Sequence, residues 1–235
     1  MDKTIAVFGA GTGLGSSVAR RFGREGYRVA LIARRREALD ALVEALKAEG
    51  IEAEAFTADL SRTEDISALV TAIRERFGRI DVVQYAPLSP APLVPAAELD
   101  AAMLRDWVNL YFLTPVELVH AVLPEMLERG DGGILVGFGY SVVAPSAGLS
   151  GPVPAMAACR NYIHTLHDEV ADRGVYAGTL AVRAVIGHSE THQALTYSDM
   201  DLAATLPSVD PDELADLVWE LLLTRNRTEA IHPAV

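Results

Sequence analysis

The sequence contains a single cysteine, Cys159, and only two lysines, Lys3 and Lys47. One cysteine excludes an intramolecular disulfide and is compatible with a reducing compartment. No stretch offers the roughly 18 consecutive apolar residues of a membrane span. The apolar run at Ile5–Phe8 is too short for a signal peptide. Together these absences predict a cytoplasmic protein.

Positive charge is scarce. The 20 lysines and arginines are outnumbered by 32 aspartates and glutamates, which gives a net charge of −12. The electrostatic field of a chain with this net negative charge repels nucleic acids and anionic membranes, so neither is an expected partner. The length of 235 residues and the hydrophobic content of 50% are typical of one globular domain, spanning residues 1–235.

Short apolar runs alternate with amphipathic helical patterns along the chain. Repeated β-α units of this kind predict a parallel sheet with helices on both faces, an α/β three-layer Rossmann fold of about six or seven strands. The strand candidates are Ile5–Phe8, Arg28–Ala33, Glu52–Thr57, Asp81–Gln84, Ile134–Phe138 and Tyr176–Val182, and helical patterns lie near 14–24, 36–49, 63–77, 99–128, 155–172 and 211–223.

A long segment without periodicity, 184–208, precedes the last helix. Such a loop in a compact domain is typical of a lid or binding loop, and Asp210 is the expected N-cap of the helix that follows. His188 and His192 lie four residues apart within this segment, a spacing found in zinc sites. Because no third ligand is evident, we expect no metal and interpret the segment as part of the substrate loop.

A glycine-rich turn follows the first strand and opens the first helix. Backbone N–H groups at such a turn can hold a pyrophosphate, aided by the helix dipole. The turn reads Gly9, Ala10, Gly11, Thr12, Gly13, Leu14, Gly15.

With this turn the chain resembles the short-chain dehydrogenase/reductase family. Its Gly-x-x-x-Gly-x-Gly pattern matches Gly9, Gly13 and Gly15, and Asn109 lies in a segment similar to the family's active-site helix. The resemblance implies a nicotinamide cofactor and a homodimer or homotetramer formed through the helices near 99–128 and 155–172. It also implies cofactor contacts from Asp59, Leu60, Ala86 and the residues of the glycine turn.

The end of the second strand indicates which cofactor is used. An acidic residue there would accept hydrogen bonds from the ribose 2′-hydroxyl of NAD. This chain has Arg34, Arg35 and Arg36 instead, and a guanidinium pairs with a phosphate. We therefore predict NADP(H), with Arg34 binding the 2′-phosphate.

The family's catalytic pair, a tyrosine followed four residues later by a lysine, is absent. The resemblance places Met156 and Arg160 at these two positions, and neither lysine of the chain follows a tyrosine at that spacing. Methionine has no proton to donate. Arg160 keeps a positive charge for a ribose hydroxyl near the nicotinamide.

Three polar residues are the remaining catalytic candidates. Ser141 resembles the family's substrate-orienting serine. Tyr140 is the candidate replacement proton donor, and a water molecule held by Ser141 or Asn109 is a second candidate for that donor. The family's Pro-Gly turn after the sixth strand is replaced by Arg183 and Ala184. We interpret Arg183 as a charged loop residue.

Three functions remain open. The first is an oxidoreductase that moves a hydride to or from a small carbonyl, alcohol, imine or activated alkene without a tyrosine donor. The second is a non-catalytic NADP(H)-binding sensor or structural subunit, and the third is a scaffold that has lost nucleotide binding. The glycine turn and Arg34 oppose the third. The missing tyrosine favours the second, whereas Asn109, Ser141 and Arg160 favour the first.

Overall fold

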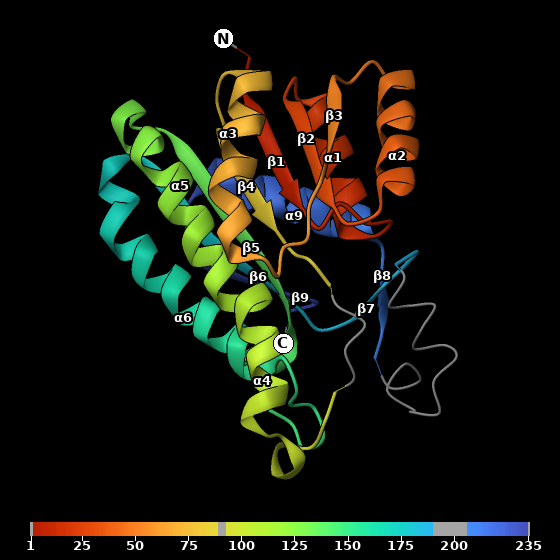
Figure 1. Cartoon of the computed structure of the whole chain (residues 1–235), viewed down its shortest axis with the longest axis vertical. Helices are drawn as coiled ribbons and strands as arrows, with labels where there is room; N and C mark the ends of the chain where they lie inside the picture. Colours follow the sequence, from red (N-terminus) through yellow and green to blue (C-terminus); the bar gives the residue numbers. More distant parts are fainter. Residues whose placement is uncertain (1, 89–92, 190–205, 235) are drawn as a thin grey trace.

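A seven-stranded parallel sheet forms the centre of the molecule, with helices on both faces (Figure 1). The computed structural model describes residues 2–88, 93–189 and 206–234. The strand order is β3-β2-β1-β4-β5-β6-β9, which confirms the three-layer Rossmann expectation. The strands are β1 (Thr4–Phe8), β2 (Arg28–Ala33), β3 (Ala53–Thr57), β4 (Val82–Tyr85), β5 (Gly132–Gly139), β6 (Val175–Val182) and β9 (Glu229–His232).

Each face of the sheet is covered by its own set of helices and its own apolar core. One core is formed with α3, α5 and α6, and the other with α1, α2 and α9. Burial of both faces explains why the central strands are almost wholly apolar. The helices are α1 (Leu14–Arg24), α2 (Arg36–Ala48), α3 (Ile66–Phe77), α4 (Ala101–Val108), α5 (Thr114–Arg129), α6 (Val153–Val170) and α9 (Pro211–Thr224).

The chain reverses its direction of winding at β1. From β1 it proceeds outward through β2 and β3 to one edge, and then returns to β4 on the other side of β1. In such sheets the crevice outside the carboxyl ends of the strands at this point is the usual ligand site. The glycine turn Gly9–Gly15 begins there, directly after β1.

Most predicted elements agree with the structure, and the differences lie in two places. The long helix near 99–128 is interrupted by a π-helical turn, Asn109–Leu113, which separates α4 from α5. The edge strand β9 was not among the predicted strands, although seven strands were within the expected number. The Asp210 N-cap is confirmed, because its carboxylate accepts a hydrogen bond from the Asp212 backbone at 2.9 Å.

The segment after β6 begins and ends in a small two-stranded sheet. Strand β7 (Val185–Ile186) pairs in parallel with β8 (Ser208–Val209). Most of the predicted substrate loop, including His192, lies outside the described residues. The described ends of this loop are therefore fixed close to the carboxyl edge of the sheet.

One helical stretch, Ala101–Arg129, is long and apolar enough by composition alone to cross a membrane. Core helices of soluble proteins meet the same criterion. Within this stretch Leu118, Val122 and Met126 are buried against the sheet and α3, so the apolar character is explained by packing in the core.

Candidate active site at the carboxyl edge of the sheet

The glycine turn adopts a conformation that requires glycine at two positions. Gly9 has a φ of +93°, and a Cβ atom there would lie 2.6 Å from the Pro87 backbone. A Cβ atom on Gly15 would lie 2.5 Å from the Gly9 carbonyl oxygen. These two glycines therefore let the turn close tightly. Gly11 is different, because it is exposed and a Cβ atom there would meet nothing closer than the Gly9 carbonyl oxygen, at 4.0 Å.

The amino terminus of α1 is open toward an anion. Its N-cap is Gly13, which supplies no side-chain hydrogen bond, and no acidic residue lies in the first turn. The first N–H groups of a helix have no intrahelical acceptor and carry the positive end of the helix dipole. The predicted contacts Gly11, Thr12, Gly13 and Leu14 are thus brought together in a shape that suits a pyrophosphate.

The loop after β7 lies over this turn. The Thr12 hydroxyl donates a hydrogen bond to the His188 carbonyl at 2.9 Å, and a Cβ atom on Gly13 would lie 3.0 Å from the Ser189 Cβ. His188 itself has a φ of +58°, which is unusual for a residue other than glycine. The contact joins the glycine turn to the described start of the loop after β7.

Arg34 and Asp59 lie near each other at the ends of β2 and β3. Hydrogen bonds from the Ser61 backbone and hydroxyl, at 3.0 and 2.7 Å, hold the pKa of Asp59 below its usual range, and the Arg34 charge adds to this effect. Arg36 is paired with Asp40 at 2.8 Å. No carboxylate of the described residues lies within ion-pair distance of Arg34, so its exposed guanidinium can take a phosphate.

Residues predicted to contact the cofactor meet around the end of β5. A Cβ atom on Gly137 would lie 3.0 Å from the Ala86 side chain and 3.6 Å from that of Leu14. The Leu60 carbonyl accepts a hydrogen bond from the buried Thr114 hydroxyl at 2.7 Å. Strand β5, the loop after β4 and the start of α1 therefore lie close together at the crevice.

Asn109 is the first residue of the π-helical turn. The wider turn accompanies a hydrogen bond from the buried Tyr85 hydroxyl to the Leu110 carbonyl. Such turns inside α-helices often mark functional sites. The π turn packs against α6, so Asn109 belongs to a segment that lies next to the helix on which the family's catalytic pair is expected.

Tyr140 and Ser141 form a short 3₁₀ turn (Tyr140–Val142) directly after β5. Both residues are partly exposed, and a Cβ atom on Gly139 would lie 3.8 Å from the Ser141 hydroxyl oxygen. The Arg183 guanidinium carbon lies 5.8 Å from the centre of the Tyr140 ring. Two polar side chains and a cation are therefore gathered at the carboxyl ends of β5 and β6.

Arg160 already has a partner. Its guanidinium makes a bidentate ion pair with Glu229 on β9, at 2.6 and 2.7 Å, and Glu229 also accepts from Thr179 at 3.0 Å. A ribose contact by Arg160 stays a prediction, and it would require this guanidinium to leave Glu229. Met156 is buried in the core, with 9% of its surface exposed. The sequence carried no signal for Glu229, which lies 69 residues away.

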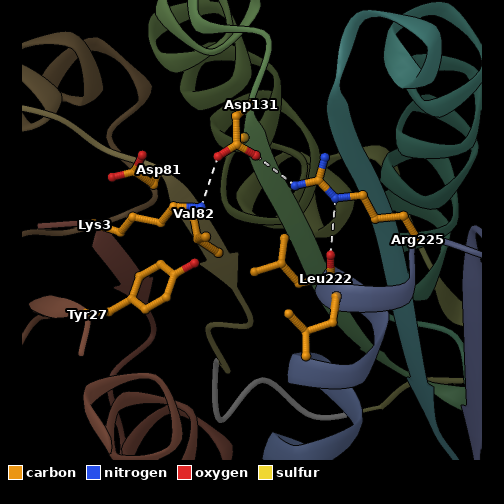
Figure 2. A pocket seen from close by; sticks show the side chains of 9 residues that line it. Lys3, Tyr27, Asp81, Val82, Asp131, Leu222 and Arg225 are labelled. Atoms are coloured by element: carbon orange, nitrogen blue, oxygen red, sulfur yellow. Dashed lines mark hydrogen bonds and ion pairs between the residues drawn. The ribbon is translucent and has the colours of Figure 1, made fainter. Parts of the chain in front are cut away.

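The pocket shown in Figure 2 lies at the opposite, amino-terminal edge of the sheet. Its volume is about 340 Å³. Asp131 accepts from Lys3 at 3.0 Å and from Arg225 at 2.9 Å, and Arg225 also donates to the carbonyls of Leu222 and Gly174. The Asp131 carboxylate bridges the two cations, and Arg225 joins the strand ends to α9, so we interpret the pocket as structural.

Comparisons with known proteins agree with this geometry. The model of the short chain dehydrogenase family matches residues 3–192. A fatty acyl-CoA reductase of Mycobacterium tuberculosis is 32% identical over 99% of this chain and 77% of its own length. A putative ketoacyl reductase of Streptomyces coelicolor is 36% identical over 57% of this chain and 52% of its own.

Among solved structures, an actinorhodin polyketide ketoreductase variant determined with NADPH is 25% identical, with a TM-score of 0.81 over 98% of this chain and 95% of that one. The family match covers the glycine turn, the π turn and the residues after β5 and β6. The chain therefore belongs to the short-chain dehydrogenase family of oxidoreductases.

Proposed function

We propose that the protein is an NADP(H)-dependent oxidoreductase that acts without a tyrosine proton donor on α6. The observation that carries this proposal is the arrangement at one edge of the sheet. The α1 terminus, which has no side-chain cap, lies on one side of the crevice with Arg34, which has no carboxylate partner within residues 2–88, 93–189 and 206–234. Tyr140 and Ser141 follow β5 on the other side. A scaffold that had lost nucleotide binding would not need these features together.

The residues present fit NADP(H). The glycine turn would hold the pyrophosphate, and Arg34 would bind the 2′-phosphate beside Asp59. NADPH is the cofactor named for the ketoreductase neighbour, and NADP for another structure of this fold. A guanidinium gains little from the 2′-hydroxyl of NADH, so the preference for NADPH should be marked.

NADPH, when bound, supplies a hydride to the carbonyl carbon of the substrate. The carbonyl oxygen must then gain a proton to become a hydroxyl group. We infer that Tyr140 would donate that proton directly, and that Ser141 would orient the carbonyl oxygen or hold a water that donates instead, because both follow β5 at the carboxyl edge. The reverse reaction removes the same proton and hydride from an alcohol.

A carbonyl compound is the substrate class best supported. The proteins named above are a fatty acyl-CoA reductase, a putative ketoacyl reductase and a polyketide ketoreductase, and each name describes reduction of a carbonyl group. We therefore place carbonyls ahead of imines and activated alkenes. The small-molecule substrate would enter between Tyr140 and the described start of the loop after β7.

The first test is calorimetric titration with NADPH and with NADH, followed by a screen of carbonyl substrates for NADPH oxidation. We expect NADPH to bind at least tenfold more tightly than NADH and some carbonyl compounds to be reduced. Binding without any turnover would instead support the second function, a non-catalytic NADP(H) sensor or structural subunit. The engaged Arg160 and buried Met156 are the observations that favour this alternative.

We also propose a cytoplasmic homodimer or homotetramer that uses the groove between α5 and α6. This groove has a volume of about 570 Å³. It is lined by apolar side chains such as Val116, Leu123 and Tyr162, and also by Glu117, His120, Thr165 and Glu169. Sedimentation analysis of the wild type and of Leu123→Glu tests the proposal. Dissociation by this variant is the expected result, and a monomeric wild type would refute it.

A further inference from the structure

Arg183 and Tyr140 occupy adjacent positions at the carboxyl edge. Gly139, at the end of β5, is paired in register with Val182, at the end of β6. Tyr140 directly follows Gly139, and Arg183 directly follows Val182. The backbone N–H of Arg183 donates to the His232 carbonyl at 2.7 Å. Its guanidinium carbon lies 5.8 Å from the Tyr140 ring centre, a cation–π arrangement that orients the side chain.

Arg183 differs from most arginines of this acidic chain, because its guanidinium has no carboxylate partner among the residues that the structure describes. Many arginines in the described parts of the chain pair with aspartate or glutamate, as Arg160 does with Glu229. Within residues 2–88, 93–189 and 206–234, the only hydrogen-bond acceptor of the Arg183 side chain is the Ala234 carbonyl, at 3.4 Å. Arg183 is also partly exposed. Its charge is therefore available to an anionic ligand.

We propose that Arg183 determines substrate specificity by binding a carboxylate on the substrate. The preferred substrate is then an oxo acid in the reducing direction, or the matching hydroxy acid in the oxidising direction. This inference rests on the proposed function. The carbonyl would lie toward Tyr140 and Ser141, and the carboxylate toward the Arg183 fork, which can donate two parallel hydrogen bonds to it.

A carboxylate suits this site better than a phosphate. One guanidinium matches the single charge and planar shape of a carboxylate, whereas a phosphate dianion with the same partner keeps one negative charge unpaired. The carboxylate takes no part in the redox step, because it is neither oxidised nor reduced. Hydride and proton go to the carbonyl group only.

The test measures binding separately from turnover. The protein is saturated with NADP⁺, so that no reduction can occur, and is titrated with 4-oxopentanoate or with its methyl ester. We expect the acid to bind the wild type more tightly than the ester does. Arg183→Gln should weaken acid binding roughly 10- to 100-fold and leave ester binding within about twofold, as expected for loss of one charge-assisted pair.

Matched variants separate this role from a structural one. Arg183→Lys should restore part of the acid affinity. Arg173→Gln, which removes another exposed arginine at the distant end of α6, should change neither affinity. In turnover assays Arg183→Gln should raise KM for the acid with little change in kcat, because binding of a remote group is lost equally from ground and transition states.

Several outcomes would overturn the proposal. Equal weakening of acid and ester by Arg183→Gln would assign Arg183 a structural role. Tighter binding of a phosphorylated oxo compound than of the acid, lost in Arg183→Gln, would assign a phosphate instead. If NADP⁺ binds but neither the acid nor any carbonyl compound binds, the proposed function itself is wrong. If the ester binds tightly and the acid binds weakly, only the proposed role of Arg183 is wrong, and the proposed function is unaffected.

Discussion

Arg160 and Glu229 form a bidentate ion pair, at 2.6 and 2.7 Å, that joins α6 to the edge strand β9. Both side chains are largely buried, with 29% and 16% of their surfaces exposed. Glu229 also accepts from Thr179 in the neighbouring strand. In this chain the cation expected to hold the ribose instead fastens the last strand of the sheet.

Glu229→Gln should lower the free energy of unfolding by about 2–3 kcal/mol at pH 7, because it leaves the partly buried Arg160 charge without its counter-charge. Burial raises the pKa of Glu229, but hydrogen bonds from Arg160 and Thr179 outweigh it, so the folded-state pKa is lowered. The stabilisation is therefore present above the unfolded pKa of about 4.3 and is lost as the pH falls through the folded pKa.

Urea unfolding of both proteins at pH 7 and in acid checks this dependence. Glu220→Gln is the control, since Glu220 pairs with Arg227 at 3.0 Å on the surface and should contribute less than about 1 kcal/mol. A constant difference between wild type and Glu229→Gln at every pH would contradict the expectation.

Arg34→Ala should weaken NADPH binding roughly 10- to 100-fold and leave NADH binding nearly unchanged, because only NADPH carries the phosphate. Calorimetry measures both affinities. Arg36→Ala serves as the control, since that guanidinium is paired with Asp40 and should matter far less. Equal effects of the two substitutions would show that general positive charge, rather than Arg34, selects the cofactor.

Gly11→Ala and Gly15→Ala should separate cofactor binding from folding. A methyl group at Gly11 would make only an ordinary contact with the Gly9 carbonyl oxygen, at 4.0 Å. The folded protein should therefore keep its stability, while the methyl group obstructs a pyrophosphate close to the backbone. At Gly15 the Cβ atom would lie 2.5 Å from the Gly9 carbonyl oxygen. This clash should destabilise the protein by at least ~1 kcal/mol. Thermal melts with and without NADPH distinguish the two cases. Unchanged NADPH affinity in a stable Gly11→Ala protein would argue against the pyrophosphate site.

Tyr140→Phe should reduce kcat roughly 100- to 10,000-fold if this hydroxyl donates the proton, with little change in NADPH affinity. Ser141→Ala should reduce kcat as well if the hydroxyl orients the carbonyl oxygen or a water. Steady-state kinetics with a carbonyl substrate found in the screen checks both. Full activity in the double variant would place the proton donor elsewhere.

Cys159 should resist thiol reagents in the folded protein. Its side chain is fully buried in α6, and burial raises the pKa of the thiol to about 12. The reactive thiolate is therefore almost absent at pH 8. Titration with a chromogenic disulfide should show no rapid reaction before denaturation and one thiol per chain afterwards. Rapid reaction of the native protein would indicate that this part of α6 opens.

The sequence was sufficient for features that depend on neighbouring residues. The period of apolar residues predicted α1 over 14–24, and the structure has it at Leu14–Arg24. Asp210 was recognised as an N-cap because capping acts over two or three residues. The glycine turn is similarly local, since the close approach of Gly15 to Gly9 spans six positions of the chain.

Only the tertiary structure determined the features that depend on distant residues. Strand β9 is short and mixed in polarity, and it forms because β6 supplies its hydrogen-bond partners. The π turn that begins at Asn109 accompanies a hydrogen bond from the Tyr85 hydroxyl to the Leu110 carbonyl, 25 residues later in the chain. Arg160 and Arg183 have similar local sequences, because each directly follows an apolar residue. Their environments differ because folding brings Glu229 to one and the Tyr140 ring to the other, and ion pairs over such separations leave no periodic pattern in the chain.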